Sequence, residues 1–430
     1  MTTSSINTLI EPSYTIFPTT IPDVIRGLIV SYLDEDNYTA NQLRKECINI
    51  TIKDTRNNCT YKNGALHSFD DYPAKIIDTT EEKNKNDGTI VNDQDEHVNQ
   101  DEQDYQDEQY FIKHTWYNYG SKHRSYDKPA EVYYYSNKKI HIQRWYQNNY
   151  LHREDDKPAI IYYYQNGDIK HMRWYKEGQL HREGTEPAEI TYYSNGKIDT
   201  IVYYINGVKH RDGDRPAETY YYPDGKINIL AWYQNGLSHR INDLPAKICF
   251  NENERIEEES WYIHGNLHRP NDKPAVVKYF PDGHLYKLSW YINGYRHREE
   301  DRPAKINYNQ DGTLETISYF KDGNLHRDND LPAKTDYFIY NPSKINTNIW
   351  AINGKYHRNN DKPAEIKYYP NLNNTIKFEA WLQNGELYRE EGKPLWNKYS
   401  VNGNLITNDN TITNETPYHE EIYFTNEYED

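Results

Sequence analysis

Cysteine is scarce in this chain of 430 residues, which contains only Cys47, Cys59 and Cys249. Three thiols at unrelated positions form neither a disulfide framework nor the paired spacing of a zinc site. The first twenty residues lack a basic start followed by an apolar run, and no segment approaches the roughly 18 apolar residues that cross a membrane. We therefore expect a soluble, intracellular protein with no signal peptide and no membrane span.

Clusters of basic residues are also missing. The net charge is −16, and two acidic segments account for all of it. Residues 81–109 hold eleven acidic residues against two lysines, which gives −9, and residues 407–430 hold seven acidic residues and no Lys or Arg, which gives −7. The rest of the chain is balanced, which argues against nucleic acid or an anionic membrane as the main partner, because both require clustered Lys and Arg.

The strongest pattern in the chain is a histidine that recurs every 29 residues, with one final step of 31. Seven residues before each of these histidines lies Trp or Tyr, and six residues after it lies Pro, nearly always followed by Ala. A fixed period of this kind indicates one supersecondary unit that is copied and stacked. The histidines are His123, His152, His181, His210, His239, His268, His297, His326 and His357.

Each copy contains two turns of the Asn-Gly type, such as Asn206-Gly207 and Asp224-Gly225, which suit tight hairpins. Residues after Pro-Ala alternate, so Ala159, Ile161 and Tyr163 are expected on one buried face of a sheet. The intervening positions are expected to be solvated, as an antiparallel sheet allows. They include Glu131, Glu189, Lys247, Lys278 and Lys305.

The predicted fold is therefore mainly β: an elongated antiparallel β-meander repeat array of about eleven double-hairpin units, with a small α-helical N-terminal head. An amphipathic pattern after Pro22 predicts the head. We expect residues 74–79 to pair with 110–117 across the acidic insertion. The expected segments are a disordered N-terminus (1–20), the helical head (21–50), a first degenerate repeat (51–79), an acidic disordered insertion (80–109), the repeat array (110–406) and an acidic tail (407–430).

A structural role for the repeated polar residues is favoured over a catalytic or metal-binding one. Consecutive histidines are at least two strands, or roughly 10 Å, apart, so neighbouring copies cannot share one zinc ion. We expect the repeated aspartates to accept hydrogen bonds from loop amides or from the arginine three positions earlier, as in Arg153 with Asp156. The fourth copy has Gly184 and Thr185 in this loop, which we expect to be less ordered. No catalytic residue, metal site or cofactor is predicted.

The run Trp-Tyr-x-Asn-Gly-x-Leu-His-Arg-x-x-Asp-x-Pro-Ala resembles the variant MORN-type repeats of large DNA viruses, and the resemblance covers residues 60 to 406. It is carried by Trp145, His152, Arg153, Asp156, Pro158, Trp261, His268, Arg269, Asp272 and Pro274. The head resembles a shortened F-box, which implies that a Skp1-type ubiquitin-ligase adaptor is a partner. The residues that would bind this adaptor are Pro22, Ile25, Leu28, Ile29 and Leu33.

These observations predict a non-enzymatic viral scaffold for protein–protein interaction, located in the host cytoplasm or the virion. Two alternatives stay open. One is an F-box-like substrate adaptor that recruits the Skp1-type ligase. The other is a carbohydrate-binding module in which Trp-Tyr pairs form aromatic cages, although packing of these rings in the core is the simpler explanation.

Overall fold

The computed structural model describes residues 14–17, 51–54, 59–62, 65–68, 71–78, 112–370, 374–390 and 392–409. Regular structure in these ranges consists of β-strands. The predicted helical head, the acidic insertion and the tail beyond residue 409 lie outside them. Within the described ranges, no helix is long and apolar enough to cross a membrane.

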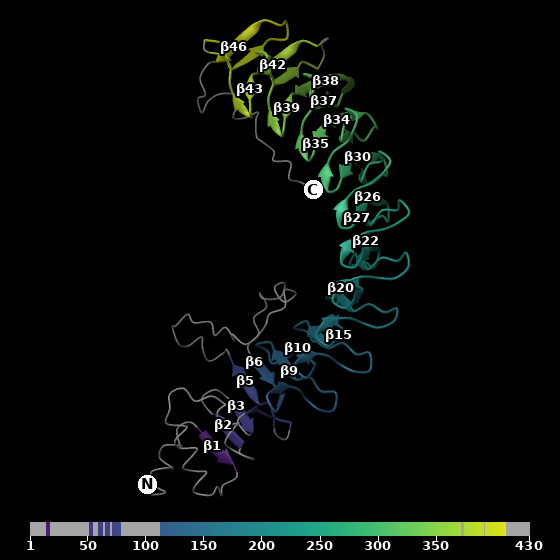
Figure 1. The fold of residues 1–430 in the computed structure, drawn as a ribbon, viewed down its shortest axis with the longest axis vertical. Helices are drawn as coiled ribbons and strands as arrows, with labels where there is room; N and C mark the ends of the chain where they lie inside the picture. The colour runs from purple at the N-terminus through teal and green to yellow at the C-terminus, as the bar shows by residue number, and fades with distance from the viewer. Residues whose placement is uncertain are drawn as a thin grey trace, which may run out of the picture. The chain divides into compact units, whose positions relative to one another are not determined.

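The chain divides into two compact units, each of which contains a run of consecutive antiparallel strands (Figure 1). The first unit comprises residues 1–212 and 217–226, and the second comprises residues 213–216 and 227–430. In the first unit, β13 pairs with β14 within one copy, and β14 pairs with β17 of the next copy. The predicted meander is therefore confirmed, with two long strands for each copy.

The strands of the main sheet in the first unit are β1 (Tyr14–Phe17), β2 (Thr51–Asp54), β3 (Cys59–Lys62), β5 (Lys75–Asp78), β6 (Ile112–Thr115), β9 (Glu131–Tyr134), β10 (Ile140–Arg144), β13 (Ile160–Tyr163), β14 (Ile169–Arg173), β17 (Glu189–Tyr192), β18 (Ile198–Val202) and β21 (Glu218–Tyr221), and β3 also forms a short hairpin with β4 (Ala65–Leu66). β5 pairs with β6, in the register Lys75 to Thr115, so the pairing expected across the acidic insertion is present. β1 pairs with β2 and lies within residues 1–20, where we expected no regular structure.

The second unit continues the same pattern of paired long strands. These are β22 (Ile227–Ala231), β25 (Lys247–Phe250), β26 (Ile256–Ser260), β29 (Val276–Tyr279), β30 (Leu285–Ser289), β33 (Lys305–Tyr308), β34 (Leu314–Ser318), β37 (Lys334–Phe338), β38 (Asn341–Ile349), β41 (Glu365–Tyr368), β42 (Ile376–Ala380), β45 (Trp396–Tyr399) and β46 (Leu405–Asp409). The interval of 31 residues, from His326 to His357, contains β38, which is nine residues long.

A short hairpin separates the long strands of successive copies. Its Asn-Gly turn has positive φ at both central residues, as at Asn206 (51°) and Gly207 (80°), which is the conformation that a two-residue hairpin loop favours. The short hairpins are β3–β4 (Ala65–Leu66), β7–β8 (Tyr117–Asn118, Ser121–Lys122), β11–β12 (Tyr146–Gln147, Tyr150–Leu151), β15–β16 (Tyr175–Lys176, Gln179–Leu180), β19–β20 (Tyr204–Ile205, Val208–Lys209), β23–β24 (Tyr233–Gln234, Leu237–Ser238), β27–β28 (Tyr262–Ile263, Asn266–Leu267), β31–β32 (Tyr291–Ile292, Tyr295–Arg296), β35–β36 (Phe320–Lys321, Asn324–Leu325), β39–β40 (Ala351–Ile352, Lys355–Tyr356) and β43–β44 (Leu382–Gln383, Glu386–Leu387).

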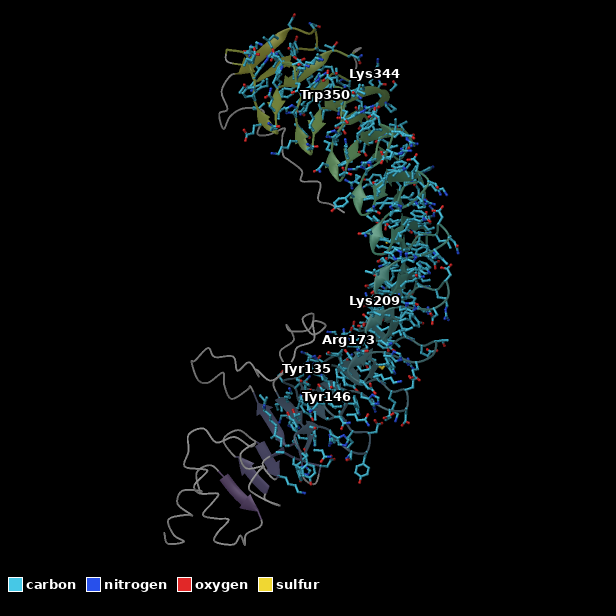
Figure 2. All side chains as sticks on the ribbon, viewed as in Figure 1. Tyr135, Tyr146, Arg173, Lys209, Lys344 and Trp350 are labelled. Carbon is cyan, nitrogen blue, oxygen red and sulfur yellow. The ribbon has the colours of Figure 1, made fainter. Side chains whose placement is uncertain are left out.

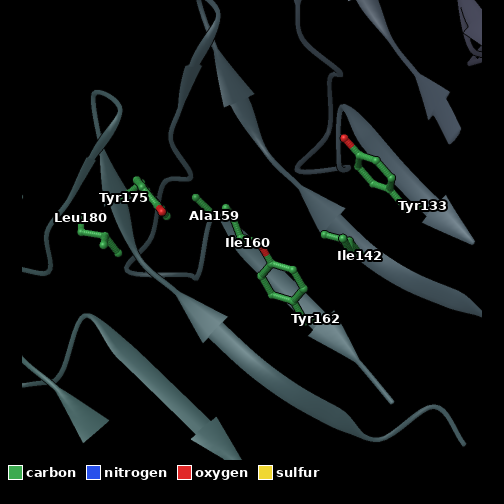
Figure 3. Close-up of a cluster of buried hydrophobic side chains, with 7 residues drawn as sticks. All are labelled: Tyr133, Ile142, Ala159, Ile160, Tyr162, Tyr175 and Leu180. Atoms are coloured by element: carbon green, nitrogen blue, oxygen red, sulfur yellow. The ribbon is translucent and has the colours of Figure 1, made fainter. Parts of the chain in front are cut away.

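The short hairpins pack on one face of the long strands, which we call the covered face. In Figure 3, Tyr175 and Leu180 of the hairpin β15–β16 lie against the buried cluster that contains Ile160 and Tyr162 of β13. Full burial of a side chain such as Ile160, which is 2% exposed, stabilises a fold by about 1.5–3 kcal/mol. In this cluster the hairpin β15–β16 therefore contributes two of the seven buried side chains.

The covered face corrects one prediction from the sequence. The polar positions of the long strands were expected to be solvated, but Glu131 and Lys305 are only 0% and 8% exposed. The side chains of Glu189 and Lys278 are 12% and 26% exposed, and only Lys247, at 37%, stays well exposed. The choice of buried face was also wrong: Ile160 and Tyr162 are 2% and 3% exposed, whereas Ile161 and Tyr163, which we expected in the core, are only half-buried. The reason is that the hairpins shield the face that carries the charges.

Candidate functional site: the repeated motif and the hairpin surface

Eight tryptophans occupy one position of the repeat; all eight are buried, and seven of them are held from two sides. Trp145 is 6% exposed, and the guanidinium of Arg153 lies 3.8 Å from the centre of its ring. Its Nε1–H donates to the backbone carbonyl of Asp127, at 3.1 Å. The same two contacts hold Trp261, through Arg269 and the carbonyl of Asp243. Arginine thus covers one face of each of these two rings.

The arginine joins two copies, which corrects the predicted pairing of Arg153 with Asp156. Arg153 instead binds Asp127 of the preceding copy through two hydrogen bonds of 2.7 and 3.0 Å. Asp156 accepts the equivalent pair of bonds from Arg182 of the following copy. The same step of one copy joins Arg124 to Asp71, Arg240 to Asp214, Arg269 to Asp243, Arg298 to Asp272, Arg327 to Asp301, Arg358 to Asp330 and Arg389 to Asp361.

The repeated histidine also contacts the next copy. The Nδ1 atom of His268 accepts the backbone N–H of Asn293, at 3.2 Å, in the turn of the following hairpin. Nδ1 of His152 accepts the amide of Glu177 in the same way. Because an acceptor Nδ1 leaves the ring proton on Nε2, that side can donate to a neighbouring carboxylate, as His152 can to Glu154 at 3.2 Å. The histidine therefore fixes the position of the next hairpin.

Together these contacts form what we call the clamp: Trp and Arg of one copy, and His and Asp of the copy before it. Pro158 and Pro274 lie in the same loop, where their carbonyl oxygens accept a bond from Arg153 and Arg269. All ten motif residues named from the sequence thus lie outside the strands, in the segments that connect them. Within the described residues, no group of three His, Cys, Asp or Glu side chains is arranged to hold a metal ion.

The end copies lose the clamp residues on one side only. In the first copy, Thr60 and Ser68 stand in the Trp and Arg positions, while His67 and Asp71 are kept and contact the next copy. The last copy keeps Trp381 and Arg389, which bind backwards to Asp361. Its histidine and aspartate positions are occupied by Tyr388 and Gly392. The motif therefore has a direction, which the sequence contains but which could be recognised only once the contacts were known.

A second cation strengthens many of the clamps. In most copies the residue before the proline is Lys or Arg, and Lys273 binds Asp243 at 2.6 Å beside Arg269. Hydrogen bonds from Arg269 and Lys273 lower the pKa of Asp243 from 3.8 to about 2. Asp214 has no such lysine because Leu244 occupies the position, and only Arg240 lowers its pKa.

The fourth copy breaks the clamp. Thr185 stands where other copies have the aspartate, so Arg211 stacks on Tyr203 at 3.6 Å without the usual carboxylate 26 residues earlier. The corresponding loop of the next copy also differs, because its residue with positive φ is Gly213. The Nε1–H of Trp232 is buried there without a hydrogen-bond partner. Whether the loop at Gly184 is less ordered stays a prediction.

The covered face of the first unit contains a buried cluster of charges. The Glu131 carboxylate lies 2.9 Å from Lys122, 3.3 Å from Lys113 and 3.5 Å from Arg144. It also accepts a bond from the hydroxyl of Tyr146, which Figure 2 labels together with Arg173 of the same unit. Burial alone would raise the pKa of Glu131, but the three cations outweigh it and lower the pKa to about 2. The cluster is an ionised structural centre, and sequence analysis had placed Glu131 in solvent.

The outer face of the short hairpins, which we call the hairpin surface, is where the copies differ. Tyr150, Leu237 and Tyr295 occupy the same position in their hairpins and are 61%, 48% and 63% exposed. A Cβ atom at Gly265 would lie 3.3 Å from Leu237 of the previous hairpin, so neighbouring hairpins are in contact. The residue pairs of this surface are Gln147/Tyr150, Lys176/Gln179, Ile205/Val208, Gln234/Leu237, Ile263/Asn266, Ile292/Tyr295, Lys321/Asn324, Ile352/Lys355 and Gln383/Glu386.

Comparisons with known proteins identify no family for this chain. No family model matches it, and no curated protein matches it. Among solved structures, the chain is similar to the crystal structures of TcdB2-TccC3, at 11% identity over 66% of this chain, and of TcdB2-TccC3-Cdc42, at 10% identity over 68%. Both TM-scores are 0.11, and the chain spans about a fifth of the length of those proteins (20% and 18%). Likeness at this level carries no argument about fold or function.

The five residues predicted to bind a Skp1-type adaptor, Pro22, Ile25, Leu28, Ile29 and Leu33, lie outside the described residues. The adaptor hypothesis therefore stays a prediction from the sequence.

Proposed function

We propose that this chain is a non-enzymatic repeat scaffold that mediates protein–protein interaction. One observation carries the proposal: the repeated polar and aromatic residues are used to join copies, whereas the exposed residues of the hairpin surface change from copy to copy. Tyr150, Leu237 and Tyr295 expose apolar side chains at positions where other copies have Gln179, Asn324 or Lys355. Exposed apolar and aromatic side chains favour contact with another protein.

The test is a quantitative comparison of the proteins that co-purify with the full chain and with a hairpin-surface variant. Leu237→Lys and Tyr295→Lys together place charges on two hairpins without touching the clamp. We expect specific partners to be lost, while the circular dichroism spectrum is unchanged. Glu300→Lys, at a loop position with a 77% exposed side chain, is the matched control. A set of partners that is the same for both variants and the unaltered chain would contradict the proposal.

We further propose, from the resemblance to repeats of large DNA viruses, that the scaffold acts in an infected host cell or in the virion. Quantitative proteomics of purified particles and of infected cytoplasm tests this. Enrichment in either fraction is the expected result, and absence from both would rule it out.

A further inference from the structure

Among the strands that the structure describes, histidines occur only in the first unit. They are His114 on β6, His141 on β10 and His171 on β14, and none of them belongs to the 29-residue series. His171 is the most deeply buried of the three, with an exposed fraction of 0%. Histidine is the side chain whose charge ordinarily changes near neutral pH, so a buried histidine can couple the stability of a fold to pH.

His171 shares one carboxylate oxygen with an arginine. Its Nε2 atom lies 2.8 Å from Oε1 of Glu189 on β17, and Nη2 of Arg173 lies 3.2 Å from the same oxygen. Nε of Arg173 is also only 3.3 Å from Nε2 of His171. Because the short contact with a carboxylate oxygen requires a donor, Nε2 carries the ring proton of the neutral histidine.

Glu189 stays ionised in this group. Burial alone would raise the pKa of Glu189, but the hydrogen bond from His171 and the charge of Arg173 lower it to about 2. A protonated His171 would therefore add a second cation beside Arg173, at a carboxylate oxygen that Arg173 already uses. Arg173 is only 7% exposed, so little water screens the repulsion between the two cations.

The strands on both sides of His171 enclose its ring. Tyr162 of β13 lies opposite His171, with the two ring centres 5.4 Å apart and the ring planes at 20°. Thr191 of β17 lies opposite it on the other side. Tyr175 of the hairpin β15–β16 belongs to the same buried cluster as Tyr162. The imidazole is thus held inside the covered face, away from water.

These surroundings favour the neutral form of His171. Burial lowers the pKa of His171 below its usual value of 6.5. The hydrogen bond with Glu189 opposes this shift, whereas the positive charges of Arg173 and Lys170 on the same strand add to it. Because the folded-state pKa lies below the unfolded value, the contribution of neutral His171 to stability is complete above pH 6.5 and decreases as the pH falls below it.

We propose that His171, Glu189 and Arg173 form a pH-sensitive switch that loosens β13, β14 and β17 when the medium becomes mildly acidic. Glu189 links β17 to β14 through both partners, and a charge on His171 weakens that link because the two cations repel each other. The described strands of the second unit contain no histidine and therefore lack this switch. The proposal does not depend on the function proposed above, because it concerns only the chain itself.

Hydrogen–deuterium exchange of the full chain at pH 7.5 and pH 5.0, measured by mass spectrometry and corrected for the intrinsic exchange rate, tests the proposal. We expect the amides of β13, β14 and β17 to exchange at least about fivefold faster at pH 5.0, within a limit of about tenfold for each pH unit below 6.5. The amides of β30 and β34 in the second unit are the internal reference and should change much less. The histidines of the 29-residue series occur in both units, so their titration affects both.

Two substitutions remove the titrating group. The array itself has Phe378 on β42 and Thr200 on β18 at the position of His171, so His171→Phe and His171→Thr introduce residues that this sheet already accommodates. In both variants, the exchange of β13, β14 and β17 should respond to pH no more than the reference strands. His284→Phe, at a turn where the side chain is 68% exposed, is the matched control and should keep the full response.

Three results would overturn the proposal. The first is equal acceleration of exchange in both units of the unaltered chain. The second is an undiminished response to pH in the two His171 variants, which would show that other groups cause the loosening. The third is unchanged exchange of β13, β14 and β17 between pH 7.5 and pH 5.0.

Discussion

Replacement of Asp243 by Asn tests the clamp between copies most directly. Asp243 accepts hydrogen bonds from Arg269 at 2.7 Å and from Lys273 at 2.6 Å, and its pKa is lowered to about 2. The difference from its ordinary value of 3.8 corresponds to roughly 2.4 kcal/mol, at 1.36 kcal/mol for each pKa unit. The Asp243 side chain is 33% exposed, so solvent screening reduces the expected loss to about 1 kcal/mol. Asn has a similar shape and tolerates the positive φ of this position.

The direction of the pKa shift of Asp243 determines how its contribution to stability depends on pH. Because the folded-state pKa of Asp243 is below its unfolded value, the carboxylate stabilises the fold fully above pH 3.8, and this contribution is lost as the pH falls toward 2. The free energy of unfolding should therefore differ between the unaltered chain and Asp243→Asn at pH 7, and the difference should disappear near pH 2. Urea denaturation followed by tryptophan fluorescence measures it.

The control is Asp155→Asn. Asp155 also has a positive φ, but its side chain is 78% exposed and forms an ion pair with Lys157 of its own loop. This control should have little effect on stability at any pH. If Asp243→Asn destabilised the chain no more than Asp155→Asn, or by the same amount at pH 7 and pH 2, the argument for an electrostatic clamp would be wrong.

Three further substitutions test other parts of the structure. Trp261→Phe should lower the free energy of unfolding by about 1 kcal/mol more than Trp232→Phe, because only Trp261 donates its Nε1–H to a carbonyl; equal losses in urea denaturation would refute this. Glu131→Gln should destabilise the chain by about 3–5 kcal/mol, since it leaves three sheltered cations without their carboxylate, whereas Glu154→Gln, with a side chain 73% exposed, should be nearly neutral in the same assay. Gly184→Asp with Thr185→Asp should stabilise the chain by about 0.5–1 kcal/mol, because Arg211 already stacks on Tyr203 in the position to bind a carboxylate; an unchanged or lower melting temperature would show that this loop cannot adopt the usual conformation.

The regular spacing was sufficient to predict much of the architecture. Strict alternation after Pro-Ala placed Ala159 and Ile161 on one face, and the Asn-Gly turns predicted two hairpins for each copy. The pairing of β5 with β6 followed from subtracting one repeat length across the acidic insertion. These features depend on local backbone preference and on periodicity, both of which are visible in a single sequence.

The partners of the motif residues could not be predicted in the same way. Arg153 and Asp156 are three residues apart, so a local pair appeared natural, but Arg153 binds Asp127, which is 26 residues away. In a repeat array, the residue that meets a side chain can belong to the same copy or to the next, and the spacing is compatible with both. Only the loss of Trp and Arg in the first copy, and of His and Asp in the last, contained a sign of the direction.

The sequence by itself determined that the chain is a repeated series of antiparallel hairpins. Period, turn chemistry and alternation are local properties, and they recur in every copy. Only the tertiary structure decided which faces are sheltered and which residues join the copies. The short hairpins fold over the polar side of the strands and bury Glu131 and Lys305, and no pattern of residue types reveals that, because burial depends on what another part of the chain covers.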